Sequence, residues 1–143
     1  MSFDLQRFKD AQESDYPVAL NEIKAGCKES HWIWYIFPQL KGLGYSPTAK
    51  YYGLTKDEAR AYIADDVLRT RLVEISEALL ALENSNATEV MGYPDDLKLK
   101  SSMTLFMEVA PEIEVFGKVL EKFFSGEKDT RTLELLGLKG DSI

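Results

Sequence analysis

The residues best suited to chemistry in this chain lie between His31 and Gly44. This stretch reads His-Trp-Ile-Trp-Tyr-Ile-Phe-Pro-Gln-Leu-Lys-Gly-Leu-Gly and holds both tryptophans and the only histidine of the sequence. A histidine can serve as a general acid or base near neutral pH, and aromatic rings bury large areas in a core or at a binding surface. The segment therefore marks either the centre of the core or one wall of a binding cleft.

Each of these residues also has a structural interpretation. His31 can pack beside the neighbouring aromatic rings while one ring nitrogen bonds the backbone, and Trp32 and Trp34 can belong to the core rather than to a ligand platform. With one histidine and one cysteine, a zinc site would need carboxylates for most of its ligands, so we expect no metal site. The sequence identifies no catalytic residue and no cofactor.

A glycine-containing turn follows the aromatic residues. Gly42 and Gly44 precede Ser46, which can cap a helix whose first residue is a proline. Free amides at such a helix start favour an anion or a phosphate, and Lys41 and Lys50 could add positive charge. The alternative is an ordinary turn before a capped helix.

A second unusual segment begins at Lys98. Ser101, Ser102 and Thr104 are weak helix formers, yet the apolar residues around them are spaced as on a helix. Lys98 and Ser102 are four residues apart and share a helix face, which would allow a lysine-activated hydroxyl. The alternatives are that the hydroxyls line a polar cleft, or that each bonds a carbonyl one turn back.

The two segments are unusual in complementary ways, so we predict that they meet around a concavity. One is aromatic and carries glycines, whereas the other is rich in hydroxyls and lysine, and such a helix start needs polar partners if it is buried. In this interpretation lysines supply charge, a tryptophan stacks on the ligand, and hydroxyls donate hydrogen bonds. The candidate ligand-binding residues are Lys28, His31, Trp32, Trp34, Gln39, Gly42, Gly44, Ser46, Lys98, Ser101, Ser102 and Thr104.

The rest of the sequence predicts an all-α fold. Apolar residues recur at steps of three and four, the spacing of one helix face, along residues 68–82, 99–110 and 113–123. Thr55 and Glu58 form a capping-box pattern, and Asp129 can cap a short last helix. We expect a compact, single-domain multihelical bundle over residues 1–143.

The remaining helix boundaries rest on single residues. Asp4 is expected to cap a first helix that includes Phe3, and Pro17 to open a separate second helix that stops at Gly26. Residues 32–37 could form a strand, but no partner strand is evident. A short buried helix capped by Ser30 fits them better.

Composition limits the classes of function. The net charge is −7 and there is no run of Lys or Arg, so we expect no non-specific nucleic-acid binding. No signal-peptide pattern and no apolar stretch of membrane-spanning length is present, and a single cysteine fits a reducing compartment. We therefore expect a cytoplasmic protein that does not bind membranes.

The motif around the tryptophans resembles the signature of a bacterial family of unknown function whose members are sometimes mislabelled calpastatin. The resemblance implies a small multihelical fold and brings no established activity, substrate or cofactor. It covers nearly the whole chain, although Cys27 stands where the family more often has an arginine, so a basic group is missing there. The matching residues are Arg7-Phe8, Ala11-Gln12, Lys28-x-Ser30-His31-Trp32-x-Trp34-x-x-Phe37-Pro38-Gln39-x-x-Gly42-Leu43-Gly44, Tyr62, Leu68, Arg71-Leu72, Asp96-x-Lys98-Leu99-x-Ser101-Ser102-Met103-Thr104-Leu105-Phe106 and Gly126-x-x-Asp129-x-x-Thr132.

Two functions stay open at this point. The first is the binding, with or without turnover, of a small polar or anionic metabolite of nucleotide-like chemistry. The second is a protein-interaction module that receives a partner helix in an aromatic or apolar groove.

Overall fold

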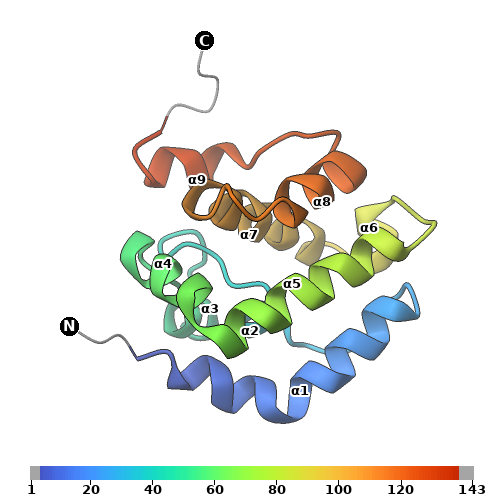
Figure 1. Cartoon of the computed structure of the whole chain (residues 1–143), viewed down its shortest axis with the longest axis horizontal. Helices are drawn as coiled ribbons and strands as arrows, with labels where there is room; N and C mark the ends of the chain where they lie inside the picture. Colours follow the sequence, from blue (N-terminus) through green and yellow to red (C-terminus); the bar gives the residue numbers. More distant parts are fainter. Residues whose placement is uncertain (1–3, 139–143) are drawn as a thin grey trace.

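Helices form all the regular structure in the computed structural model, which describes residues 4–138 (Figure 1). Within this range there is no β-strand, and one isolated parallel bridge joins Leu40 to Leu54. The predicted all-α, multihelical fold is confirmed. The helices are α1 (Gln6–Lys24), α2 (Ile33–Ile36), α3 (Pro47–Tyr52), α4 (Lys56–Ala64), α5 (Asp66–Ala81), α6 (Ala87–Met91), α7 (Asp95–Val109), α8 (Val115–Phe124) and α9 (Thr130–Leu135).

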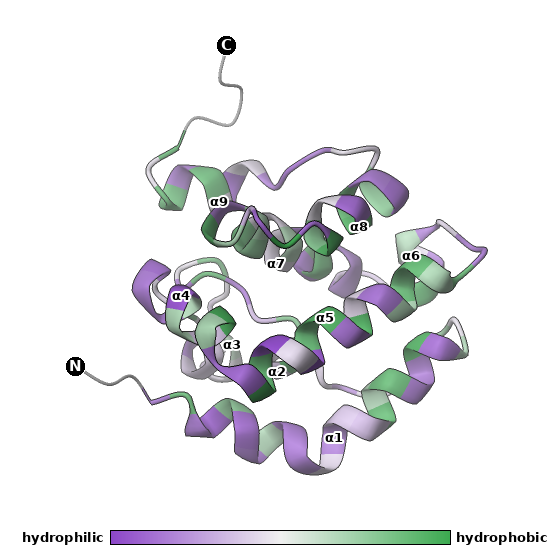
Figure 2. Ribbon diagram, viewed as in Figure 1, coloured by the Kyte–Doolittle hydropathy of each residue, from purple (hydrophilic) through white to green (hydrophobic). Residues whose placement is uncertain are grey.

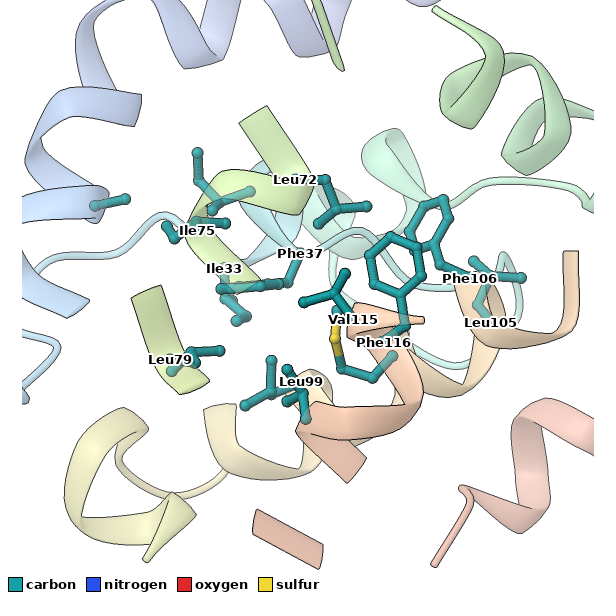
Figure 3. Close-up of a cluster of buried hydrophobic side chains, with 14 of the residues drawn as sticks. Ile33, Phe37, Leu72, Ile75, Leu79, Leu99, Leu105, Phe106, Val115 and Phe116 are labelled. Atoms are coloured by element: carbon teal, nitrogen blue, oxygen red, sulfur yellow. The ribbon is translucent and has the colours of Figure 1, made fainter. Parts of the chain in front are cut away.

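The core forms where α2, α5, α7 and α8 meet. Figure 3 shows apolar side chains from these helices pointing toward one another, with Ile33 and Phe37 contributed by the aromatic segment. α5 packs against α1 on one side and α8 on the other, and its predicted apolar stripe is buried from Leu68 to Leu79. Polar residues cover much of the outer helix surfaces (Figure 2). None of the described helices is both long and apolar enough to cross a membrane.

Capping bonds confirm three of the predicted helix starts, those at Ser46, Thr55 and Asp129. The Ser46 Oγ accepts the Ala49 amide at 3.1 Å at the start of α3, and Thr55 forms both bonds of a capping box at α4. Asp65 caps α5, and Asp129 caps α9 by accepting the Thr132 amide at 2.9 Å. These caps are local in sequence, which is why residue type and spacing suffice to predict them.

The prediction of two N-terminal helices is wrong. α1 is continuous, with Pro17 in its interior, and it changes direction near its middle (Figure 1). A proline inside a helix removes one hydrogen bond and bends the axis. Buried Tyr16 and Ala19 on either side of Pro17 anchor both halves to the core, so packing outweighs the local preference.

Three other boundaries also differ. Leu5, not Asp4, occupies the N-cap of α1, and Phe3 lies outside the described residues. Ser30 does not cap α2, because its hydroxyl donates to the Glu22 carboxylate at 2.6 Å and Trp32 takes the N-cap position. The short helix α6 carries no long apolar stripe, and the sequence patterns did not reveal it.

The two tryptophans occupy different environments. Trp32 is 1% exposed, and its indole Nε1 donates to Glu22 at 2.8 Å, whereas Trp34 is half-buried. Trp32 is therefore a core residue, and Trp34 keeps part of its ring at the surface.

Replacing Trp32 by alanine should lower the free energy of unfolding by about 3–5 kcal/mol, because it leaves a large cavity and removes a donor to Glu22. Trp34→Ala is the matched control and should cost clearly less. Urea unfolding followed by circular dichroism measures both. A loss below about 1 kcal/mol for Trp32→Ala would contradict its place in the core.

Candidate functional site

The two unusual segments line one surface cavity of about 510 Å³, which we call the Trp34 cavity. Its volume lies within the range of roughly 300–1,000 Å³ that is common for small-molecule sites. The walls come from the aromatic segment, the start of α3, the first turns of α7, and the start of α9. The lining residues are Trp34, Gln39, Leu43, Gly44, Tyr45, Ser46, Ala49, Pro94, Leu97, Lys98, Ser101, Asp129 and Arg131.

Asp95 holds the lysine of this cavity in place. Its Oδ1 lies 3.4 Å from the Lys98 Nζ, and its Oδ2 lies 2.7 Å from the Lys28 Nζ. The Lys98 ammonium also sits 5.0 Å from the centre of the Trp34 ring, a cation–π distance. Two lysines therefore share one carboxylate, which leaves one positive charge uncompensated within this cluster.

Lys28 stands behind the cavity rather than in its lining. Its side chain is 4% exposed, lies 4.8 Å from the Trp32 ring centre, and donates to the Ser30 carbonyl at 2.5 Å. A buried ammonium is tolerated when it is paired and hydrogen-bonded. The structure thus gives Lys28 and Trp32 supporting positions, where the sequence suggested direct contact with a ligand.

Glu22 fixes the chain that leads into the aromatic segment. Its carboxylate accepts hydrogen bonds from the Glu29 and Ser30 amides at 2.9 and 3.0 Å, in addition to the Ser30 hydroxyl and the Trp32 indole. Partial burial alone raises the pKa of the Glu22 carboxyl. These hydrogen bonds outweigh that effect and bring its pKa from 4.5 down to about 2.

Close packing at Gly44 shapes the glycine turn. A Cβ built on Gly44 would lie 2.4 Å from the Cβ of Ala49, so only glycine fits there. Gly42 has φ +105°, a conformation that favours glycine, and it faces Leu135 outside the cavity lining. Of the two glycines, Gly44 therefore forms cavity wall, while Gly42 makes the turn.

The hydroxyls of α7 have three different environments. The Ser101 hydroxyl lines the cavity and donates to the Leu97 carbonyl at 3.1 Å. Thr104 is buried, donates to the Lys100 carbonyl at 2.8 Å, and accepts the Asp129 amide at 2.9 Å, which ties α9 to α7. Ser102 is fully buried, and its Oγ has no hydrogen-bond partner among the described residues. A lysine-activated Ser102 is therefore not formed.

The cavity includes six of the twelve predicted residues: Trp34, Gln39, Gly44, Ser46, Lys98 and Ser101. Lys28, Trp32, Ser102 and Thr104 lie behind it or elsewhere in the interior. His31 is exposed and is not among the lining residues. No group of three His, Cys, Asp or Glu side chains within residues 4–138 is arranged to hold a metal.

Arg131 is a cationic lining residue that the sequence patterns did not single out. It is the second residue of α9, and its guanidinium is 58% exposed and 3.6 Å from Glu134. A cation in the first turn of a helix is unfavourable for the helix dipole. This unfavourable position is the sequence signal by which Arg131 could have been identified. Asp129 faces the same cavity, but its carboxylate is bound to the Thr132 amide and hydroxyl.

Comparisons with known proteins identify relatives but no activity. A family model described as "Protein of unknown function (DUF1810)" matches residues 2–136. The chain is similar to the crystal structure of the conserved hypothetical protein Rv1873 from Mycobacterium tuberculosis, with 43% identity and a TM-score of 0.92. The similarity covers 96% of this chain and 99% of that one. The comparison with curated proteins found no match.

The low pKa of Glu22 predicts a loss of stability in acid. Its folded-state pKa of about 2 lies below its ordinary value of 4.5. The stability that Glu22 contributes is therefore complete above pH 4.5 and is lost as the pH falls toward 2. The difference in unfolding free energy between wild type and Glu22→Gln should be largest above about pH 5 and shrink in that window.

Chemical denaturation at several pH values measures this difference. Glu77→Gln, which changes an exposed carboxylate on α5, is the control. A difference for Glu22→Gln that stays constant between about pH 5 and pH 2 would contradict the assigned role of Glu22.

Proposed function

We propose that this chain, which belongs to the family of proteins of unknown function DUF1810, binds a small anionic or polar metabolite of nucleotide-like chemistry in the Trp34 cavity. The observation that carries the proposal is the convergence of Lys98, Arg131 and the Trp34 ring on one cavity. In a chain with a net charge of −7, Lys98 and Arg131 give this cavity two cations against the one carboxylate of Asp129, which favours an anion over a cation as its ligand.

Each wall offers a different kind of contact. The exposed part of Trp34 suits a planar ring, and Lys98 and Arg131 suit a phosphate or carboxylate. The Ser46 hydroxyl accepts the Ala49 amide and keeps its own proton for donation, whereas the Ser101 hydroxyl donates to Leu97 and keeps lone pairs for acceptance. A ring that carries an anionic group matches this combination.

Binding, rather than a named reaction, is what these side chains support. The lining residues of the cavity include no histidine and no cysteine. Ser102, the candidate nucleophile, is fully buried outside the cavity lining, and its Oγ has no hydrogen-bond partner among the described residues. We therefore assign ligand recognition to the cavity and no catalytic step.

A groove between α7 and α8 supports the alternative, a protein-interaction module. It measures about 460 Å³, and its lining combines apolar residues such as Met107, Ile113 and Leu120 with the charged residues Glu114, Lys118 and Glu121. A groove lined by apolar and charged residues suits an amphipathic helix. A screen of nucleotides and sugar phosphates by thermal shift separates the two functions, because a metabolite that binds the native state raises its melting temperature.

Lys98→Ala should weaken the binding of AMP about tenfold or more, since a charge-assisted hydrogen bond contributes about 1.5–3 kcal/mol. The melting temperature should change little, because Asp95 keeps Lys28 as its partner and a partly exposed ion pair contributes at most about 1 kcal/mol. Isothermal titration calorimetry and thermal denaturation measure the two effects.

Lys50→Ala is the matched control, since Lys50 is an exposed lysine on α3 outside the cavity lining. An equal effect of both substitutions on AMP binding would count against the cavity. So would a loss of stability in Lys98→Ala with no change in AMP affinity.

A further inference from the structure

A second cavity of about 530 Å³ lies beside the first, and Leu97 belongs to the lining of both. We call it the Asp96 cavity. Its other walls come from the loop before α6, the start of α6, and the end of α8. Leu97 is 49% exposed and is shared by both linings, so it separates the two concavities, and we call it the Leu97 ridge.

The first turns of α7 place one lysine in the lining of each cavity. Lys98 and Ser101 line the Trp34 cavity, whereas Asp96 and Lys100 line the Asp96 cavity. Helix geometry explains the division, because residues three or four apart share a face and residues two apart do not. The Lys98 Nζ lies 5.0 Å from the centre of the Trp34 ring, and the Lys100 Nζ lies 6.0 Å from that of Phe124, so the two ammonium groups lie on the two sides of the Leu97 ridge. Asp95 pairs with Lys98, and Glu127 pairs with Lys100.

The Asp96 cavity differs in chemistry from its neighbour. Asn84, Ser85, Asn86 and Thr88 place amide and hydroxyl groups in its lining, and Phe123 and Phe124 add ring surface. The Asn84 and Asn86 side-chain oxygens accept backbone amides, and the Thr88 hydroxyl donates to Asp96, so the amide N–H groups of Asn86 and the hydroxyl of Ser85 are the donors left for a ligand. Asp96 is 7% exposed, and its carboxylate accepts the Thr88 hydroxyl at 2.6 Å and the Leu97 amide at 2.9 Å. Amides and hydroxyls beside an aromatic ring suit a neutral polyol, whose hydroxyls need many hydrogen bonds.

We propose that the ligand is a nucleoside diphosphate sugar that spans both cavities, an inference that rests on the proposed function of the Trp34 cavity. The base stacks on Trp34, the phosphates lie over the Leu97 ridge between Lys98 and Lys100, and the sugar occupies the Asp96 cavity. Each cavity by itself has the volume of a small-molecule site, and a ligand that fills both gains the contacts of each without a second loss of translational freedom.

Titration calorimetry with AMP, ADP and ADP-glucose tests this inference on the full chain. ADP-glucose should bind at least tenfold more tightly than AMP and clearly more tightly than ADP. Lys100→Ala should reduce the affinity for ADP-glucose at least tenfold and affect AMP by less than threefold. Lys98→Ala should weaken all three ligands.

Glu127→Gln is the matched control for Lys100→Ala. It removes the ion pair between Glu127 and Lys100 and leaves the lysine in place, so it should preserve the preference for ADP-glucose. Circular dichroism verifies that each variant keeps the helical fold.

The outcomes distinguish the two proposals. Equal affinities for AMP and ADP-glucose, or an equal loss of both in Lys100→Ala, would overturn the two-cavity ligand while the Trp34 cavity stands. ADP-glucose that binds no better than ADP would overturn the sugar site. A wild-type chain that binds none of the three ligands would overturn both proposals.

Discussion

A buried ion pair between Lys28 and Asp95 is the interaction on which the candidate site depends. It joins the chain after α1 to the first turn of α7 across a distance of 2.7 Å. Removing an ammonium group from water is costly unless the interior supplies partners. Here the partners are a carboxylate, the Ser30 carbonyl and the Trp32 ring. The Lys28 amide also donates to the Val90 carbonyl of α6 at 2.7 Å, so backbone and side chain hold the same junction.

The geometry of the Trp34 cavity follows from this junction. Because Asp95 contacts both lysines, the position of buried Lys28 determines where Asp95 can hold Lys98. Glu22 holds the residues that follow Lys28 in place, because its carboxylate accepts hydrogen bonds from Ser30 and Trp32. Thr104 fixes the start of α9 in the same way, because its hydroxyl accepts a hydrogen bond from the Asp129 amide. Side chains around the cavity are thus held in place by ion pairs and hydrogen bonds to neighbouring elements, which is the arrangement that preorganises a binding site.

Residue spacing was sufficient to predict the helices whose signals are local. The apolar stripe of α5 and the caps at Ser46, Thr55 and Asp129 depend on residues within one or two turns of each other. Pro17 misled the prediction because the contacts that keep α1 continuous come from distant parts of the chain, which no local pattern reveals. Ser30 also misled the prediction, because its hydroxyl donates to Glu22, eight residues earlier, and does not cap a helix.

The sequence predicted which two segments line the site, because each segment has an unusual composition. The complementary chemistry of the two segments predicted that they meet, and Gln39 and Gly44 line the same cavity as Lys98 and Ser101. It did not distinguish residues that face the cavity from those that support it, because Trp32 and Trp34 look equivalent in sequence and differ in burial. Arg131 is far along the chain and enters the cavity only through the packing of α9 on α7.

A crystal structure of the protein grown with AMP tests most directly whether the Trp34 cavity binds an anionic ring compound. We expect electron density for the base against the Trp34 ring and for the phosphate within hydrogen-bonding distance of Lys98 or Arg131. Lys28 and Asp95 should stay paired beneath the ligand. An AMP molecule bound at another surface, with the Trp34 cavity empty, would contradict ligand binding in this cavity.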